Sequence, residues 1–128
     1  MPPAPGLRAV RPFVVEPSDT AEALGSGDLP VLGTPRLLAW AEATTVAALD
    51  GRLGAGESSV GVRVELEHVA AAAVGVAVQV TADLVHVDGR LLRFSVAAST
   101  GDTVLGTATV TRVVVARERF MSRVVPCV

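Results

Sequence analysis

Apolar and polar residues alternate with a period of two between residues 59 and 68. One set of alternate positions is Val60, Val62, Val64, Leu66 and His68, and the other is Ser59, Gly61, Arg63, Glu65 and Glu67. Successive side chains of a strand point to opposite faces of a sheet. The segment is therefore predicted to be a half-buried strand whose first set of residues faces the core.

Further alternating runs and two turn signals follow this strand. The closing segment RERFMSRV contains Phe120 and Met121, which could cover an edge or the end of the sheet. The Asp-Gly pair in the first turn is typical of a two-residue hairpin. The predicted strands cover residues 74–84, 92–98 and 104–116, with turns at Asp88–Gly89 and Gly101–Asp102.

The first third of the chain predicts a strand and a long loop. Residues Arg8–Glu16 include β-branched and aromatic residues and end before Pro17, which favours a strand. The turn-rich segment 17–33 carries Leu24, Leu29 and Leu32. We expect it to be a loop that packs over the protein as a lid.

One long helix is predicted in the segment TPRLLAWAEATTVAAL. Thr34 is its expected N-cap, Pro35 its first residue, and the pair Asp50–Gly51 its end. Between Leu37 and Leu49 the one charged residue is Glu42. A helix without a charged face for water is expected to be buried nearly all round.

The order of strand, loop, helix and four strands favours an α+β architecture in one domain over residues 1–128. An antiparallel sheet of about five strands curled around one central helix accommodates that order. A single helix does not cover such a sheet, and exposed sheet edges are usually paired. We therefore expect a homodimer or a dimer of dimers.

Composition and charge exclude several classes of protein. The net charge is −2, and the eleven basic residues, all arginine, are scattered along the chain, so no nucleic-acid partner is expected. The longest apolar run, Val69–Val78, is half of the ~20 residues that a membrane-spanning helix needs. The first residues lack a secretory-signal pattern, so a cytoplasmic location is expected. The lone Cys127 excludes an internal disulfide and receives no role.

Glu42 is the most informative candidate for chemistry. Burying a carboxylate without a partner is costly, so its position in an apolar helix calls for an explanation. One interpretation is a functional carboxylate, and the alternative is a gap in the wrapping where Glu42 reaches solvent or an arginine. The functional interpretation is preferred.

His68 ends the apolar face of its strand and is predicted to point toward the helix. A histidine that faces a buried carboxylate can form an acid/base pair, and the alternative is a core or rim histidine with one satisfied hydrogen bond. His86 lies beside the hairpin turn and is expected to be solvated.

Thr34 and Gly61 are weaker candidates on their own. Thr34 suits helix capping, but it precedes Glu42 by about two helical turns, so one ligand could contact both. Gly61 interrupts a strand of larger residues, which indicates a bulge, a close approach of a ligand, or simply tight packing. No nucleophile elbow, phosphate loop or metal-ligand cluster is present in the sequence, so no metal is expected and nucleotide hydrolysis is disfavoured.

These residues form a set that resembles a known family. The segments are GT ending at Thr34, AWAE ending at Glu42, SVG ending at Gly61, ELEH ending at His68, VDGR at 87–90, and RFMSRV near the end. They resemble the hot-dog-fold thioesterases of the fluoroacetyl-CoA thioesterase type, in which a threonine precedes the helix glutamate by eight residues and a glycine precedes the strand histidine by seven. Both spacings hold here.

The resemblance implies a hot-dog fold and hydrolysis of an acyl-CoA to a carboxylic acid and free CoA. Thr34, Glu42 and His68 fall on the catalytic positions of the family, and Gly61 falls on a substrate-binding backbone position near the thioester. Glu42 would be a general base or a nucleophile, and His68 would shuttle a proton or activate water. Thr34 would orient the carboxylate or the substrate, and amides near Gly61 would stabilise the oxyanion. No cofactor is implied, because CoA is part of the substrate.

The segment 17–33 departs from the family, whose lid is rich in aromatic residues, because it contains none. An acyl group other than fluoroacetyl is therefore expected. The alternative function is a non-catalytic hot-dog protein that binds an acyl-CoA or a small apolar ligand. An enoyl-thioester hydratase is disfavoured, because its Asp and His four residues apart at a helix start have no match. A purely structural dimer gives no reason to bury Glu42.

Overall fold

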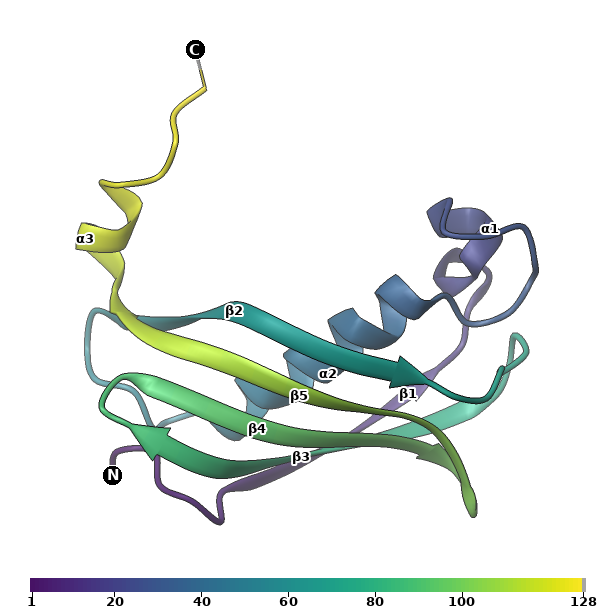
Figure 1. The fold of residues 1–128 in the computed structure, drawn as a ribbon, viewed down its shortest axis with the longest axis horizontal. Helices are drawn as coiled ribbons and strands as arrows, with labels where there is room; N and C mark the ends of the chain where they lie inside the picture. The colour runs from purple at the N-terminus through teal and green to yellow at the C-terminus, as the bar shows by residue number, and fades with distance from the viewer. Residues whose placement is uncertain (128) are drawn as a thin grey trace.

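Five strands form one antiparallel sheet in the computed structural model, which describes residues 1–127 (Figure 1). The spatial order is β1-β3-β4-β5-β2, so β2 lies at one edge and β1 at the other. Neighbouring strands are antiparallel throughout. The strands are β1 (Arg8–Val14), β2 (Glu57–His68), β3 (Ala77–Asp88), β4 (Leu91–Thr100) and β5 (Thr103–Ala116).

The long helix α2 (Thr34–Ala48) lies along one face of this sheet, as Figure 1 shows. Its residues Leu37 and Trp40 are buried against the sheet, where Phe94 is fully buried. The ring of Trp40 stacks on that of Phe13 in β1 with a centroid separation of 4.6 Å. The predicted α+β architecture, a five-stranded sheet around one helix, is confirmed, and it is the hot-dog arrangement.

Short helices occupy the predicted loop and the C-terminal segment. They are η1 (Pro17–Asp19), α1 (Ala21–Leu24) and α3 (Arg117–Met121). In the predicted lid, Leu32 is buried, whereas Leu24 and Leu29 are exposed, so only part of this segment packs on the core. No helix among residues 1–127 is long and apolar enough to cross a membrane.

The prediction that α2 is buried nearly all round is wrong. Its outward positions recur at helical spacing and are half-buried or exposed, with Val46 at 51% exposure. The reason is that a single sheet covers only one side of the helix. The exposed face consists of Pro35, Leu38, Ala39, Glu42, Ala43 and Val46, and it is apolar except for Glu42.

The predicted alternation in β2 is also wrong before residue 63, because the strand contains a bulge. The register with β5 shifts between Gly61 and Arg63, which leaves Val62 as an extra residue that is 57% exposed. One extra residue reverses the faces on one side of a bulge. Ser59 and Gly61 therefore turn toward the helix, together with His68 at the far end.

Phe120 and Met121, which could have covered an edge or the end of the sheet, do not do so within one copy. They are 39% and 61% exposed on α3, which projects from the end of β5 (Figure 1). Within one copy of the chain, these two apolar side chains remain on the surface.

Candidate functional site

Thr34 and His68 form the first polar group of the site. The Oγ1 atom of Thr34 lies 2.8 Å from Nδ1 of His68, so the start of α2 is joined to the end of β2. The helix is capped by Gly33, and Thr34 is the first helical residue with no capping hydrogen bond. The prediction that Thr34 is the N-cap is therefore wrong, and its hydroxyl is free to interact with the imidazole.

The other ring nitrogen of His68, Nε2, is buried and has no hydrogen-bond partner among the described residues. The strand opposite leaves no room for a side chain here, because a Cβ on Gly106 would lie 2.7 Å from the carbonyl oxygen of Glu67. An imidazole that is held at one nitrogen and has no partner at the other can accept or donate a proton at the second nitrogen. The group therefore has the chemistry of an acid/base catalyst.

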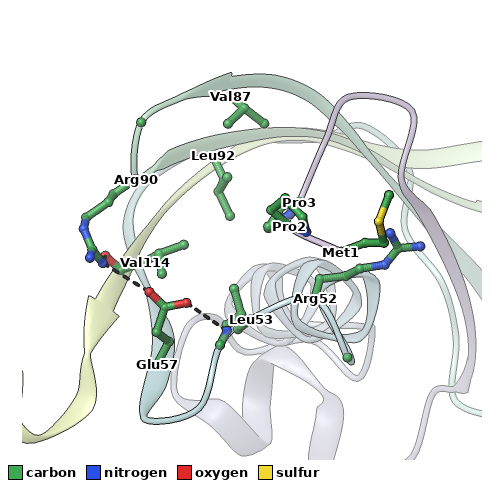
Figure 2. A pocket seen from close by; sticks show the side chains of 13 residues that line it. Met1, Pro2, Pro3, Arg52, Leu53, Glu57, Val87, Arg90, Leu92 and Val114 are labelled. Atoms are coloured by element: carbon green, nitrogen blue, oxygen red, sulfur yellow. Dashed lines mark hydrogen bonds and ion pairs between the residues drawn. The ribbon is translucent and has the colours of Figure 1, made fainter.

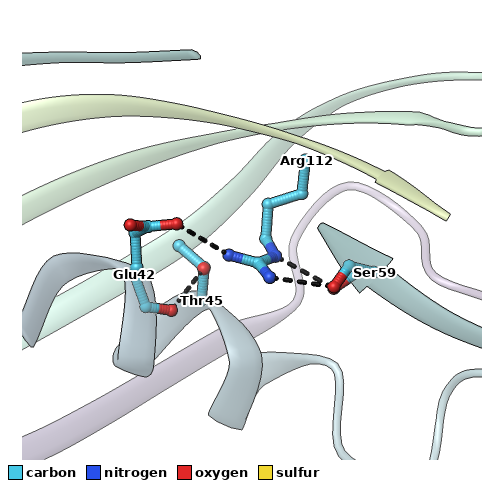
Figure 3. A network of polar contacts seen from close by, with 4 residues as sticks. All are labelled: Glu42, Thr45, Ser59 and Arg112. Carbon is cyan, nitrogen blue, oxygen red and sulfur yellow. Dashed lines mark hydrogen bonds and ion pairs between the residues drawn. The ribbon is translucent and has the colours of Figure 1, made fainter. Parts of the chain in front are cut away.

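Glu42 and Arg112 form the second polar group, which Figure 3 shows. The Nη1 atom of Arg112 lies 3.3 Å from Oε2 of Glu42, and the Glu42 side chain is 34% exposed. The hydroxyl of buried Thr45 donates a hydrogen bond to the backbone carbonyl of Glu42. Glu42 thus contacts both an arginine and solvent, as the structural alternative to a functional carboxylate predicted. Its carboxylate nevertheless remains partly accessible.

Arg112 is a functional candidate that the sequence analysis missed. Its Nε donates to Oγ of Ser59 and its Nη2 donates to the carbonyl oxygen of Ser59, so the guanidinium ties β5 to β2 (Figure 3). Burial lowers the pKa of Arg112 from its ordinary value, and the adjacent Glu42 carboxylate opposes that shift. The available signal was a charged residue at an inward position of the last strand, in line with the core residues Val110 and Val114.

Gly61 lies directly against the carboxylate of Glu42. A Cβ built on Gly61 would collide with Oε2 of Glu42, and its backbone has no positive φ, so the need for glycine here is one of space. The predicted bulge at Gly61 is confirmed by the register shift that follows it. Backbone and carboxylate are therefore close enough for one small group to contact both.

The two polar groups do not meet within one copy. No hydrogen bond or ion pair joins His68 to Glu42 among residues 1–127. Thr34 and Glu42 lie on the same helix about 12 Å apart along its axis, as eight residues at 1.5 Å each require. His86 is exposed, as predicted.

A pocket of about 550 Å³ lies elsewhere, at the C-terminal end of α2 (Figure 2). Leu53, Val87 and Leu92 line it, and Glu57 and Arg90 form an ion pair of 3.5 Å at its side. None of the predicted site residues lines this pocket. It is a separate feature of the molecule.

Comparisons with known proteins place the chain in a family of thioesterases. The family model described as fluoroacetyl-CoA-specific thioesterase matches residues 15–118. The fluoroacetyl-CoA thioesterase of Streptantibioticus cattleyicolor is 34% identical over 125 residues, which are 93% of this chain and 90% of that protein. The solved structure of a threonine-to-serine variant of a fluoroacetyl-CoA thioesterase in complex with acetyl-CoA is 31% identical, with a TM-score of 0.88, and covers 94% of this chain and 95% of that one. A hot-dog-like protein from Thermanaerovibrio acidaminovorans is 28% identical, with a TM-score of 0.86 over 93% of this chain and 88% of that one.

Proposed function

Because the chain belongs to the family of fluoroacetyl-CoA-specific thioesterases, it is a thioester hydrolase, and we propose that two copies complete each site for acyl-CoA hydrolysis. The products are a carboxylic acid and free CoA. The observation that carries the proposal is the separation of Thr34–His68 from Glu42–Arg112 within one copy.

The free edge of β2 supports a two-fold dimer. β2 has twelve residues and, among residues 1–127, pairs only with β5, and long unpaired edges are usually covered. Two copies related by a two-fold axis would pair their β2 strands antiparallel. The same arrangement would place the apolar exposed faces of the two α2 helices near each other and would remove Glu42 from bulk water.

Such pairing brings the complementary groups together. Within one strand, His68 lies seven positions beyond Gly61, which is about 20 Å or more. If two β2 strands pair about their midpoint, Gly61 of the second copy lies opposite Val64, only four positions or roughly 14 Å from His68. A shift of the pairing toward the His68 end shortens this distance further.

In this composite site each residue has a distinct role. Glu42, held by Arg112, activates water as a general base or attacks the thioester carbonyl as a nucleophile. His68, oriented by Thr34, delivers the proton to the departing thiolate. Backbone amides beside Gly61 stabilise the oxyanion. We propose that no cofactor takes part and that the enzyme is cytoplasmic, which suits its one free thiol, Cys127.

The first experiment measures free-thiol release from a panel of acyl-CoAs that differ in length and polarity. Wild type is compared with His68→Ala, and loss of the proton carrier is expected to lower turnover by about 10²-fold or more. His86→Ala, which removes the exposed histidine, is the matched control. Binding of CoA analogues without turnover by the folded wild type would instead support a binding protein.

The second experiment tests the composite site by complementation. Glu42→Gln and His68→Ala chains are each expected to be inactive alone. In a mixed dimer one site would contain His68 of the first chain and Glu42 of the second, so a 1:1 mixture would regain about one quarter of wild-type activity. A site confined to one copy would give no recovery.

A further inference from the structure

A buried carboxylate lies outside the two polar groups of the site, in the short helix η1. Asp19 is 9% exposed, and burying a carboxylate is costly unless its oxygens have partners. Its Oδ2 atom accepts a hydrogen bond of 2.8 Å from the backbone N–H of Glu16. Its Oδ1 atom lies 2.9 Å from Nε of Arg36, the third residue of α2. The side chain of Asp19 therefore joins η1 to the first turn of α2.

The backbone of Asp19 also contacts the start of α2. Its carbonyl oxygen accepts a hydrogen bond of 2.9 Å from the N–H of Gly33, the N-cap of the helix. Asp19 thus binds both the residue that precedes Thr34 and the residue two positions after it. The segment between Asp19 and Gly33, which includes α1, is closed at its base beside the first turn of α2 (Figure 1).

The Asp19 carboxylate supplies a charge that the start of α2 lacks. The first turn of α2 contains no acidic residue, and Gly33 has no side chain that could cap the helix. A negative charge is favourable there, because the unpaired N–H groups of a helix N-terminus carry partial positive charge. The contact with Arg36 is an ion pair without hydrogen-bond alignment, since Arg36 Nε has no hydrogen-bond partner among residues 1–127. Charge, rather than bond direction, therefore holds Asp19 to Arg36.

Thr34 depends on this turn for its position. Its Oγ1 atom lies 2.8 Å from Nδ1 of His68, and a displacement of about 1 Å would break that hydrogen bond. We propose that Asp19 is a positioning residue for thioester hydrolysis, an inference that rests on the roles of Thr34 and His68 in the proposed function. Together with Arg36, it fixes the first turn of α2 and so holds the Thr34 hydroxyl against the imidazole.

Asp19→Asn tests this role, because it removes the charge but keeps an oxygen for the N–H of Glu16. With the best acyl-CoA, kcat should fall by about fivefold, within the range of one lost hydrogen bond, and KM should stay unchanged. Arg36→Gln should cause the same loss, whereas Arg36→Lys, which keeps the charge, should retain most activity. Asp83→Asn is the matched control, because it makes the same change in an ion pair with Arg8 between β3 and β1.

A double-mutant cycle with Thr34→Val distinguishes positioning from a general effect on the fold. Without the hydroxyl, Asp19 has nothing to position, so Asp19→Asn should lower kcat of the Thr34→Val chain by less than about twofold. Equal losses in the two backgrounds would mean that Asp19 acts independently of Thr34 and would overturn the proposal. Full activity of Arg36→Gln would overturn it as well, because the ion pair would then have no part in catalysis.

The imidazole signals of His68 provide a readout that does not depend on turnover. The chain has two histidines, and His86 is exposed, so nitrogen-15 NMR can follow the His68 ring with His86 as internal reference. Asp19→Asn should move the Nδ1 signal of His68 toward its position in Thr34→Val, and Asp83→Asn should leave it unchanged. A fall in kcat without movement of this signal would refute positioning through Thr34.

The same measurement separates this inference from the proposed function. If Asp19→Asn moves the His68 signal but wild type hydrolyses no thioester, the proposed function is wrong, and the positioning of His68 by Asp19 is supported. If His68→Ala is inactive while Asp19→Asn leaves both the signal and kcat unchanged, the proposed function is supported and this inference alone is wrong.

Discussion

The two polar groups of the site are built differently. Glu42 is held by Arg112, which is itself fixed by two hydrogen bonds to Ser59, and Gly61 closes against the carboxylate. His68 has one hydrogen bond, to Thr34, and a second nitrogen without a partner among the described residues. The Glu42 carboxylate is thus packed and held in place, whereas the imidazole, which exchanges a proton in the proposed mechanism, keeps one nitrogen without a partner among the described residues.

Replacing the Glu42 carboxylate is expected to lower catalytic activity more than any other substitution in either polar group. Glu42→Gln keeps the shape and an oxygen for Arg112 but removes the base or nucleophile, so kcat should fall by about 10²–10⁴-fold. The melting temperature should stay close to that of wild type. Glu65→Gln, at an exposed glutamate of β2, is the control for charge. Wild-type turnover in Glu42→Gln would rule out the proposed role of the carboxylate.

Gly61→Ala tests how closely the backbone of β2 packs against the Glu42 carboxylate. The new methyl would displace the Glu42 carboxylate, so kcat/KM should fall by roughly 10²-fold, within the range of a misplaced catalytic group. Gly27→Ala, in an exposed loop, is the control.

Shortening the carboxylate should relieve that clash. Glu42→Asp combined with Gly61→Ala is expected to be less impaired than the product of the two single effects, which a double-mutant cycle measures. Strictly multiplicative effects would mean that the methyl group acts on something other than the carboxylate.

Arg112→Lys separates charge from geometry. Lysine keeps the positive charge beside Glu42 but lacks the planar fork that also reaches Ser59. Activity should fall by about tenfold, and the free energy of unfolding should drop by about 1–2 kcal/mol, because buried hydrogen-bonding groups lose partners. Urea denaturation and kcat/KM measured together check this, and an unchanged variant would mean that charge alone positions Glu42.

The sequence predicted the fold because its signals are local and consistent. Period-two alternation, the Asp-Gly turn and the proline near the helix start each identify one element, and a sheet around a helix is the economical way to combine them. The register shift after Gly61 was harder to predict, because a bulge changes which residues face the core without changing their hydrophobicity. Ser59 was therefore assigned to the wrong face.

The site was predictable only in part. Glu42 stood out as a lone charge in an apolar helix, whereas Arg112 lies in a strand whose alternation includes threonines, so its inward position was less evident. Contacts between side chains far apart in the sequence, such as Arg112 with Ser59, depend on tertiary pairing that local patterns do not encode. The exposed face of α2 was mispredicted because its apolar composition does not distinguish burial within one copy from burial between copies.

The smallest loss of activity is expected in the Thr34–His68 group. Thr34→Val removes the hydroxyl that contacts His68 while keeping the shape of the side chain, so kcat should fall by up to about tenfold through loss of imidazole orientation. Because Gly33 rather than Thr34 caps the helix, the loss of stability should stay below about 0.5 kcal/mol, less than the ~1 kcal/mol typical of a lost cap. Thr34→Ser, which retains the hydroxyl, should preserve most activity. A clear loss of stability with unchanged turnover would show that Thr34 serves the helix and not the histidine.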